Sequence, residues 1–299
     1  MKGKKMKRNI IYISALSVLL LSSCDKDLVK TPYNGVSSEI VFNNPEDFTM
    51  ATRGMYSGLR GGTSYLGGES VLFGDILSDN MIIVQSGRLS YQGVFQWNYS
   101  PNSTSALFDN GYAVIRRANS ILENIDKLPD GAAKNNFKGE ALAIRGMVHF
   151  DILRLYARRY NAATENTDLG IPYVTSTDGT LQASRETMKD SFDKIIADLT
   201  ESEGLLNASN GVGRINKAAA AGLLSRVYIY KNDFPNAAAA ADRCLAISDN
   251  PGSQTEIAQI FTDATEAGVL FKIRMLDADN VKIGTFYSQT VTEGIKSEY

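Results

Sequence analysis

Five stretches between residues 105 and 250 place apolar side chains three or four positions apart, the spacing of one helix face. Breaker residues such as those in 128–131 separate them. A chain with this pattern buries its apolar faces by packing helix against helix. The expected inward residues are Ile115, Ala118, Leu122 and Ile125; Ala141, Ile144, Val148, Ile152 and Leu155; Phe192, Ile195, Leu199 and Leu206; Ala220, Leu223, Val227 and Tyr230; and Ala237, Ala241, Cys244 and Ile247.

Capping residues mark the start of three of these stretches. Thr187 with Asp190 predicts one helix N-terminus, and Asn216 predicts the next. Asp233 followed by Pro235 predicts an N-cap with proline at the first helical position. The last two helices are joined by a very short turn, and one of them presents mostly alanine. Because small residues let helix backbones approach closely, the pair resembles a tetratricopeptide unit.

The second stretch differs from the others because it is apolar on nearly all sides. Leu142, Phe150, Leu153 and Tyr156 flank its main stripe, so we expect this helix to be buried on more than one face.

Other parts of the chain lack a helical period. Residues 60–100 are rich in Gly, Ser, Asn and Tyr, which predicts loops with one or two short strands. Residues 161–183 predict a polar loop, with 170–174 extended, and residues 45–59 a short helix.

The N-terminus has the plan of a bacterial lipoprotein signal. A cationic start precedes the apolar run 10–21, which is too short to span a bilayer. The run ends in Leu21-Ser22-Ser23-Cys24, which looks like a lipobox whose cysteine is acylated. We therefore expect a signal peptide at 1–23, a tether at 24–44 and one domain at 45–299. Firm anchoring takes more than one acyl chain, and bacterial lipoproteins usually carry several.

Charge and residue counts exclude several functions. Removing the signal leaves 26 basic against 33 acidic residues, a net charge of −7, which argues against nucleic-acid binding. With Cys24 acylated, Cys244 has no internal disulfide partner. The single histidine, His149, excludes a histidine-rich metal site and is expected to lie in the core or at an interface.

Several segments, taken together and in order, resemble the SusD/RagB family of nutrient-binding outer-membrane lipoproteins of Bacteroidetes. Besides the lipobox and the 140–160 helix, they are GDILSDN at 74–80, WNYSPN at 97–102, YAVIRRAN at 112–119, GIPYV at 170–174, SRETM at 184–188 and GRINK at 213–217. The resemblance implies a mostly α fold, in which tetratricopeptide-like helical pairs carry a loop-rich ligand-binding face.

The resemblance also implies function and partners. It implies capture of an oligosaccharide or peptide and its release into a SusC-like TonB-dependent transporter, with Cys24 anchoring the protein at the outer membrane. Asp25 and Asp27 resemble an acidic surface-export signal. Family members are usually considerably longer, so a further C-terminal part is expected. Phe108 stands where the family often has tryptophan.

The loop-rich part has the residue types of a carbohydrate site, because aromatic rings bind sugar faces and polar groups bind hydroxyls. Trp97 itself is expected to be buried, as an anchor of this part on the helices. The ligand-binding candidates are Tyr65, Asp75, Asp79, Asn80, Gln85, Arg88, Tyr91 and Trp97.

Two other functions remain open. A tethered helical adaptor would bind no small molecule. An anchored hydrolase would need a carboxylate pair such as Asp75 with Asp79, or Glu201 with Glu203 on a solvated helix face. No residue pattern identifies a cofactor. The acidic run 277–280 lacks the glycine and the closing glutamate of a calcium loop.

Overall fold

A computed structural model describes residues 42–60, 65–78, 81–83, 89–100, 105–249, 251–276, 279, 281, 283–287 and 295–297. The chain divides into two units, Met1–Asn43 and Asn44–Tyr299, and every helix and strand below belongs to the second. The predicted signal peptide, Cys24 and most of the tether lie outside the described residues, as does most of the acidic run 277–280.

The first three long helices are α3 (Pro45–Arg60), α6 (Ala106–Asn124) and α7 (Ala132–Tyr156). Ser105 caps α6, and its hydroxyl accepts a 3.3 Å hydrogen bond from a backbone N–H of the first turn. A 3₁₀ turn, η2 (Ile125–Lys127), ends this helix just before the predicted breaker run. Helix α3 confirms the short helix expected near residues 45–59.

Helix α7 lies between α6 and α8, as the distribution of its apolar residues predicts. Its buried side chains point in every direction around the axis, and they include polar ones. They are Asn136, Phe137, Glu140, Ala141, Leu142, Ala143, Ile144, Arg145, Met147, Val148, His149, Phe150, Ile152 and Leu153. A helix enclosed in this way must pair its polar groups within the protein.

The next three helices are α8 (Met188–Leu205), α9 (Lys217–Tyr230) and α10 (Phe234–Ile247). Their predicted N-caps are confirmed, because each capping oxygen accepts a backbone N–H three residues on, at 3.0, 2.9 and 3.3 Å. Helix α10 begins one residue earlier than expected, so its proline stands at the second helical position.

The inward faces of the last two helices differ from the prediction. On α9, Leu224 is fully buried in place of Leu223, and Tyr230 is 45% exposed. On α10, Ala240 is buried in place of Ala241, and Ile247 is 37% exposed. The difference has a simple cause: α10 packs chiefly on α9, so only a narrow alanine-rich strip of it is covered.

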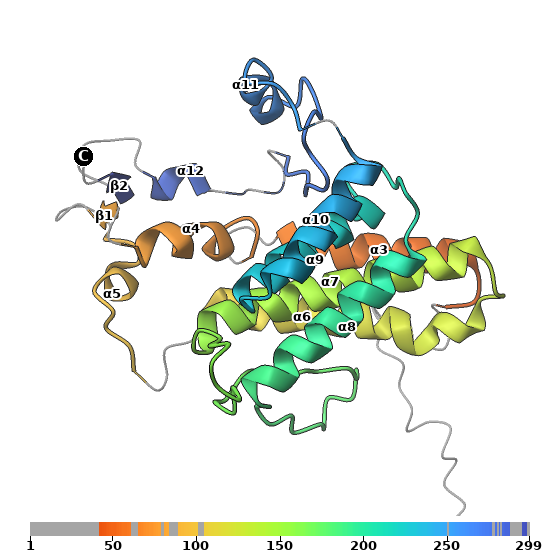
Figure 1. Ribbon diagram of the computed structural model, residues 1–299, viewed down its shortest axis with the longest axis horizontal. Coiled ribbons are helices and arrows are strands. Elements are labelled where there is room, and N and C mark those ends of the chain that lie inside the picture. The colour runs from red at the N-terminus through yellow and green to blue at the C-terminus, as the bar shows by residue number, and fades with distance from the viewer. Residues whose placement is uncertain are drawn as a thin grey trace, which may run out of the picture. The chain divides into compact units, whose positions relative to one another are not determined.

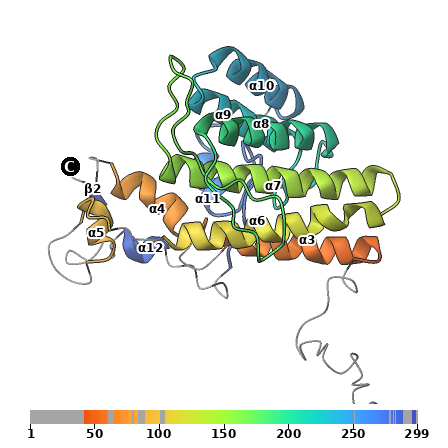
Figure 2. The same cartoon turned by 90° about the horizontal axis from the view of Figure 1, so that it is seen from below.

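Each long helix packs on the next in a continuous stack. Helix α3 lies on α6, α6 on α7, α7 on α8, α8 on α9 and α9 on α10. Figures 1 and 2 show this order from two directions, with α7 in the middle of the stack. The mostly α, tetratricopeptide-like fold expected from the sequence is confirmed.

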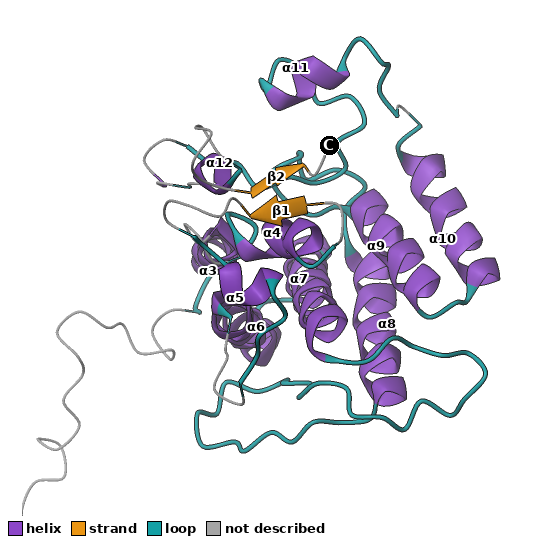
Figure 3. Ribbon diagram, turned by 90° about the vertical axis from the view of Figure 1, so that its left-hand side faces the viewer, coloured by secondary structure: helices purple, strands orange, loops and turns teal. Residues whose placement is uncertain are grey.

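The smaller elements gather beside one end of the stack. They are α4 (Glu69–Ile76), β1 (Met81–Ile83), α5 (Gln92–Phe95), α12 (Ile283–Phe286) and β2 (Ile295–Ser297), with β1 antiparallel to β2 (Figure 3). Another short helix, α11 (Ile257–Phe261), follows α10.

In 60–100, β1 confirms an expected short strand, whereas helices α4 and α5 correct the expectation that the rest is loop. The buried residues Leu72, Phe73 and Ile76 of α4 do follow a helical spacing. That stripe is only two turns long and has glycines before and inside it, so the sequence pattern resembles a loop.

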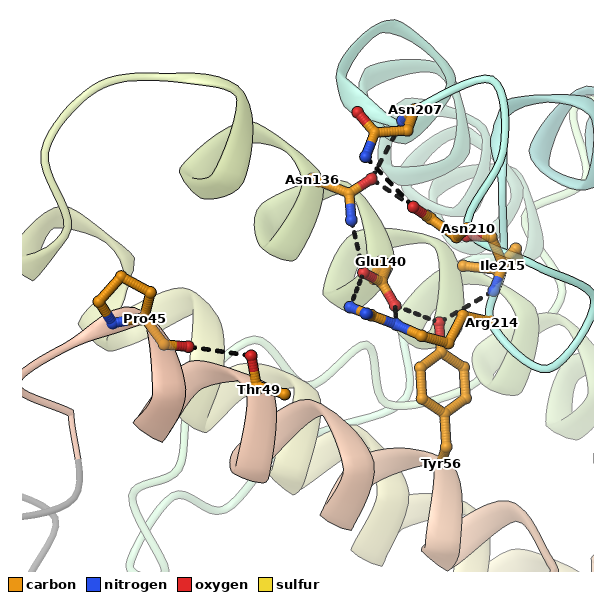
Figure 4. A network of polar contacts seen from close by, with 9 residues as sticks. All are labelled: Pro45, Thr49, Tyr56, Asn136, Glu140, Asn207, Asn210, Arg214 and Ile215. Atoms are coloured by element: carbon orange, nitrogen blue, oxygen red, sulfur yellow. Dashed lines mark hydrogen bonds and ion pairs between the residues drawn. The ribbon is translucent and has the colours of Figure 1, made fainter.

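A buried polar network joins α3 to α7 and to the loop before α9 (Figure 4). The Glu140 carboxylate accepts from the Tyr56 hydroxyl at 2.7 Å and from Arg214 at 2.5 and 2.9 Å. Asn136 donates to the same carboxylate at 2.8 Å. Burial raises the pKa of Glu140, and Arg214 opposes that rise. Because its oxygens are satisfied, this carboxylate is a structural tie between helices.

A second buried network holds the loop between α7 and α8. The Arg145 guanidinium donates to both carboxylate oxygens of Asp198 at 2.6 and 2.7 Å, and to Asn119 at 3.0 Å. Tyr173, in the loop, donates to Asp198 at 2.5 Å. The predicted extended segment 170–174 is thereby fixed against α6, α7 and α8.

His149 is a core residue, as expected, and it takes part in the same loop attachment. The backbone N–H of Val174 donates to its Nε2 at 3.1 Å, so the proton stands on Nδ1, which donates to the Arg145 carbonyl at 3.0 Å. The ring also stacks on Tyr173, with centroids 4.0 Å apart. Burial, and then the Arg145 charge, lower the pKa of His149 to about 3.

This pKa makes the protein less stable in mild acid. The unfolded chain protonates His149 below a pH of about 6.5, whereas the folded chain does so only near pH 3. Between those values the unfolded state binds more protons, so stability falls by about 1.4 kcal/mol for each pH unit. Urea unfolding should show a loss of about 2 kcal/mol between pH 7 and pH 5 from this group. His149→Gln should have a shallower pH dependence, and an unchanged slope would contradict the assignment.

Candidate functional site

An exposed aromatic patch lies at and just after α5. The Trp97 side chain is 63% exposed and Tyr99 is 57% exposed. The expectation that Trp97 is a buried anchor is therefore wrong. The anchoring residues are its neighbours Val94 and Phe95, which pack against the apolar cluster of Leu72, Ile76 and Ile83 together with Met81, Tyr91 and Tyr287.

The backbone around α5 adopts uncommon conformations that direct these rings. Leu89, Tyr91 and Trp97 have positive φ values of 51°, 62° and 53°. Such values are costly for residues with a side chain, and they concentrate at functional sites. The backbone N–H of Trp97 donates to Val94 at 3.0 Å, which closes the turn after α5. The local fold thus holds a large ring in solvent at a conformational cost.

Glu69 connects this patch to the helical stack, and sequence reasoning missed it. Its buried carboxylate accepts from the backbone N–H of Leu107 at 2.8 Å, at the N-terminus of α6. It also accepts from the Tyr91 hydroxyl. Burial raises the pKa of Glu69, and the backbone hydrogen bond opposes that rise. Burial, followed by the Glu69 charge, raises the pKa of Tyr91 to about 12.

The other candidates differ in their surroundings. Tyr65 is fully buried and its hydroxyl donates to Asp151, so the expectation that it contacts a ligand is wrong. Asp75 accepts from the Tyr287 hydroxyl at 2.5 Å, which ties α4 to the segment after α12. Tyr91 packs edge-on against Phe73, with ring centroids 6.0 Å apart. The remaining candidates, Asp79, Asn80, Gln85 and Arg88, lie outside the described residues.

Glu201 and Glu203, which were considered for hydrolysis, are engaged in ion pairs. Glu203 is buried, not solvated as expected, and accepts from Arg243 at 2.7 and 2.9 Å. Glu201 pairs with Lys138 at 2.5 Å. Among the described residues, no group of three or more His, Cys, Asp and Glu side chains is arranged to hold a metal ion.

A cavity of about 210 Å³ lies beside α4. It is bordered by Phe73 and Gly74 on α4 and by Asp151, Arg154 and Tyr230 from the helical stack. Phe73 is also the ring on which Tyr91 packs. The N-cap residue of α5 and this cavity are therefore connected through one buried side chain.

Comparison with known proteins identifies relatives of this chain. A family model, SusD-like and described as starch-binding and associating with the outer membrane, matches residues 30–229. SusD-like protein P38 of Formosa agariphila is 23% identical over 250 residues, which are 81% of this chain and 46% of the relative. The chain spans about half the length of the curated relatives it matches.

Solved structures share the fold. A candidate sugar-binding protein from Bacteroides vulgatus has a TM-score of 0.76 at 28% identity, over 85% of this chain and 60% of that one. A laminarin-binding SusD-like protein has a TM-score of 0.58 at 21% identity, over 71% and 45% of the two chains. Within the described residues, no helix combines the length and the apolar character that membrane crossing requires.

Proposed function

The chain belongs to the SusD-like family, described as starch-binding and associating with the outer membrane, and we propose that it captures a glycan or peptide nutrient as a lipid-anchored surface protein. It passes the captured molecule to a SusC-like TonB-dependent transporter. The match to the family model confirms the family resemblance predicted from the sequence. The ligand, the lipid anchor and the transporter belong to this proposal. It is a binding function without catalysis.

The observation that carries the proposal is the exposed indole of Trp97. A soluble protein that holds its single tryptophan 63% exposed, on a turn with positive φ, keeps a flat apolar surface available. The apolar faces of sugar rings stack on such surfaces, and nearby polar groups supply orientation. One relative in fold is named for binding laminarin, so laminarin belongs in the panel of ligands to test.

The membrane attachment rests on Cys24 and the residues around it. The lipobox places the cysteine directly after a short apolar run, where acylation is expected. Mass spectrometry of the mature protein should therefore find Cys24 as the N-terminal residue, with lipid on its sulfur. A Cys24→Ser variant should be lost from the membrane fraction, and a free thiol in the native protein would contradict the anchor.

The ligand proposal is tested by titrating the protein, without its signal peptide, with a panel of soluble glycans and peptides in a calorimeter. We expect saturable heat with at least one glycan, and chromatography should recover that glycan uncleaved. Uniformly absent heat would favour the helical adaptor. Cleavage products would favour the hydrolase, whose test is loss of cleavage in Asp75→Asn.

A further inference from the structure

A second cavity, of about 320 Å³, lies at the C-terminal end of α7. The buried side chains of Leu153 and Phe192 form its apolar floor. Tyr160 and Tyr230 also line it. Small-molecule sites usually measure roughly 300–1,000 Å³. This one is at the small end of that range, which suits one sugar residue better than a long segment.

Three arginines line this cavity. Arg154 lies in the last turn of α7, and Arg158 and Arg159 follow that helix. Among the residues that the structure describes, Arg158 pairs only with Asp168, at 3.5 Å and exposed to solvent, a geometry that holds it weakly. Arg159 makes no hydrogen bond or ion pair with any residue that the structure describes. Because the mature chain has an overall net charge of −7, a loosely paired cationic cluster there is a local exception.

The third arginine, Arg154, is held in place by rings. Its guanidinium carbon lies 5.2 Å from the Phe150 ring centroid and 5.4 Å from that of Tyr230. It also donates to Asp151 at 2.5 Å and to the Tyr230 hydroxyl at 3.3 Å. A planar guanidinium fixed in this way is preorganised, and its charge is partly compensated. Arg154 therefore shapes the wall, while Arg158 and Arg159 supply the available charge.

The two cavities share Arg154 and Tyr230, so they are neighbours on the same side of the stack. One cavity borders α4, whose Phe73 supports Tyr91, and the other ends at the arginines. Because the two cavities share Arg154 and Tyr230, adjacent parts of one bound molecule could reach both.

We infer that the arginine-lined cavity is a subsite for a sugar residue that carries an anionic group, either a carboxylate or a sulfate. Guanidinium groups bind both anions through paired, charge-assisted hydrogen bonds. The tyrosine rings and the apolar floor are suited to the ring of the same sugar. This inference rests on the proposed glycan-binding function and narrows its ligand class.

The test compares three tetrasaccharide probes: galacturonic acid residues, sulfated galactose residues, and neutral glucose residues. Calorimetry is done with the protein without its signal peptide, with Arg158→Gln/Arg159→Gln, and with Arg116→Gln. Arg116 is a matched control because it is exposed on α6 and is not a lining residue of either cavity.

We expect at least one anionic probe to bind tenfold or more tightly than the neutral probe. The double variant should lose that preference without a change in unfolding midpoint, and Arg116→Gln should keep it. Preference for the galacturonate or for the sulfated probe tells which anion the site takes. Equal affinity for all three probes, or an anionic preference that survives in the double variant, would overturn the inference.

This outcome is distinct from failure of the proposed function. Neutral glycan binding that depends on Trp97, with no anionic preference, removes the subsite and keeps glycan capture. Absence of binding by every glycan and peptide tested removes both.

Discussion

Replacing Arg145 by alanine is expected to lower the free energy of unfolding by about 3–5 kcal/mol, the largest effect on stability anticipated for a single change here. The side chains of Arg145 and Asp198 are each only 10% exposed, and they form a two-pronged ion pair. Removing the guanidinium leaves a buried carboxylate without its counter-charge. It also releases Asn119, which otherwise accepts from Arg145 at 3.0 Å.

Urea unfolding followed by circular dichroism at pH 7 measures this loss. Arg116→Ala, an exposed arginine on α6, is the matched control, and we expect it to change stability by about 0.5 kcal/mol at most. Tyr173→Phe removes one hydrogen bond to Asp198 and should cost about 1–2 kcal/mol. A loss below about 1 kcal/mol in Arg145→Ala would mean that solvent reaches Asp198 and that this pair is not a structural tie.

Replacing Trp97 by alanine is expected to weaken binding of the captured glycan by about 2 kcal/mol, roughly thirtyfold in Kd. The indole is 63% exposed, so its removal takes little packing from the core, and the unfolding midpoint should stay the same. Affinity and stability should therefore separate in this variant, in contrast to Arg145→Ala.

Calorimetric titration with the best glycan from the panel measures this effect. Phe261→Ala is the matched control, because Phe261 is an aromatic residue on α11 that is 87% exposed. We expect that variant to bind normally. If Trp97→Ala binds as tightly as the wild type, the exposed patch is not the capture site and the ligand contacts lie elsewhere.

The helices of this fold could be predicted because their signals are local. Thr187, Asn216 and Asp233 each cap a helix within three residues of their own position, and the apolar spacing of α6 to α10 repeats over a few turns. The face that α10 buries could not be assigned in detail, since its packing partner covers only part of it.

The candidate site was less predictable because its geometry depends on contacts between distant segments. Glu69 meets Leu107 across 38 positions, and Asp75 meets Tyr287 across 212. Tyr65 has a residue type common in sugar sites, yet it is enclosed by the core. Trp97 has a residue type that is usually buried, yet a turn holds it in solvent. Residue type alone therefore predicts neither the burial of Tyr65 nor the exposure of Trp97.

The attachment of the loop between α7 and α8 has an evolutionary consequence. Its first half is held through Tyr173 and Val174, and Thr177 donates to Glu123 at 2.8 Å. Residues 178–184, in contrast, are exposed, and within the part of the chain that the structure describes their hydrogen bonds reach no farther than Ser176. Insertions and deletions there leave the core untouched, so homologues are free to vary most in length at this point.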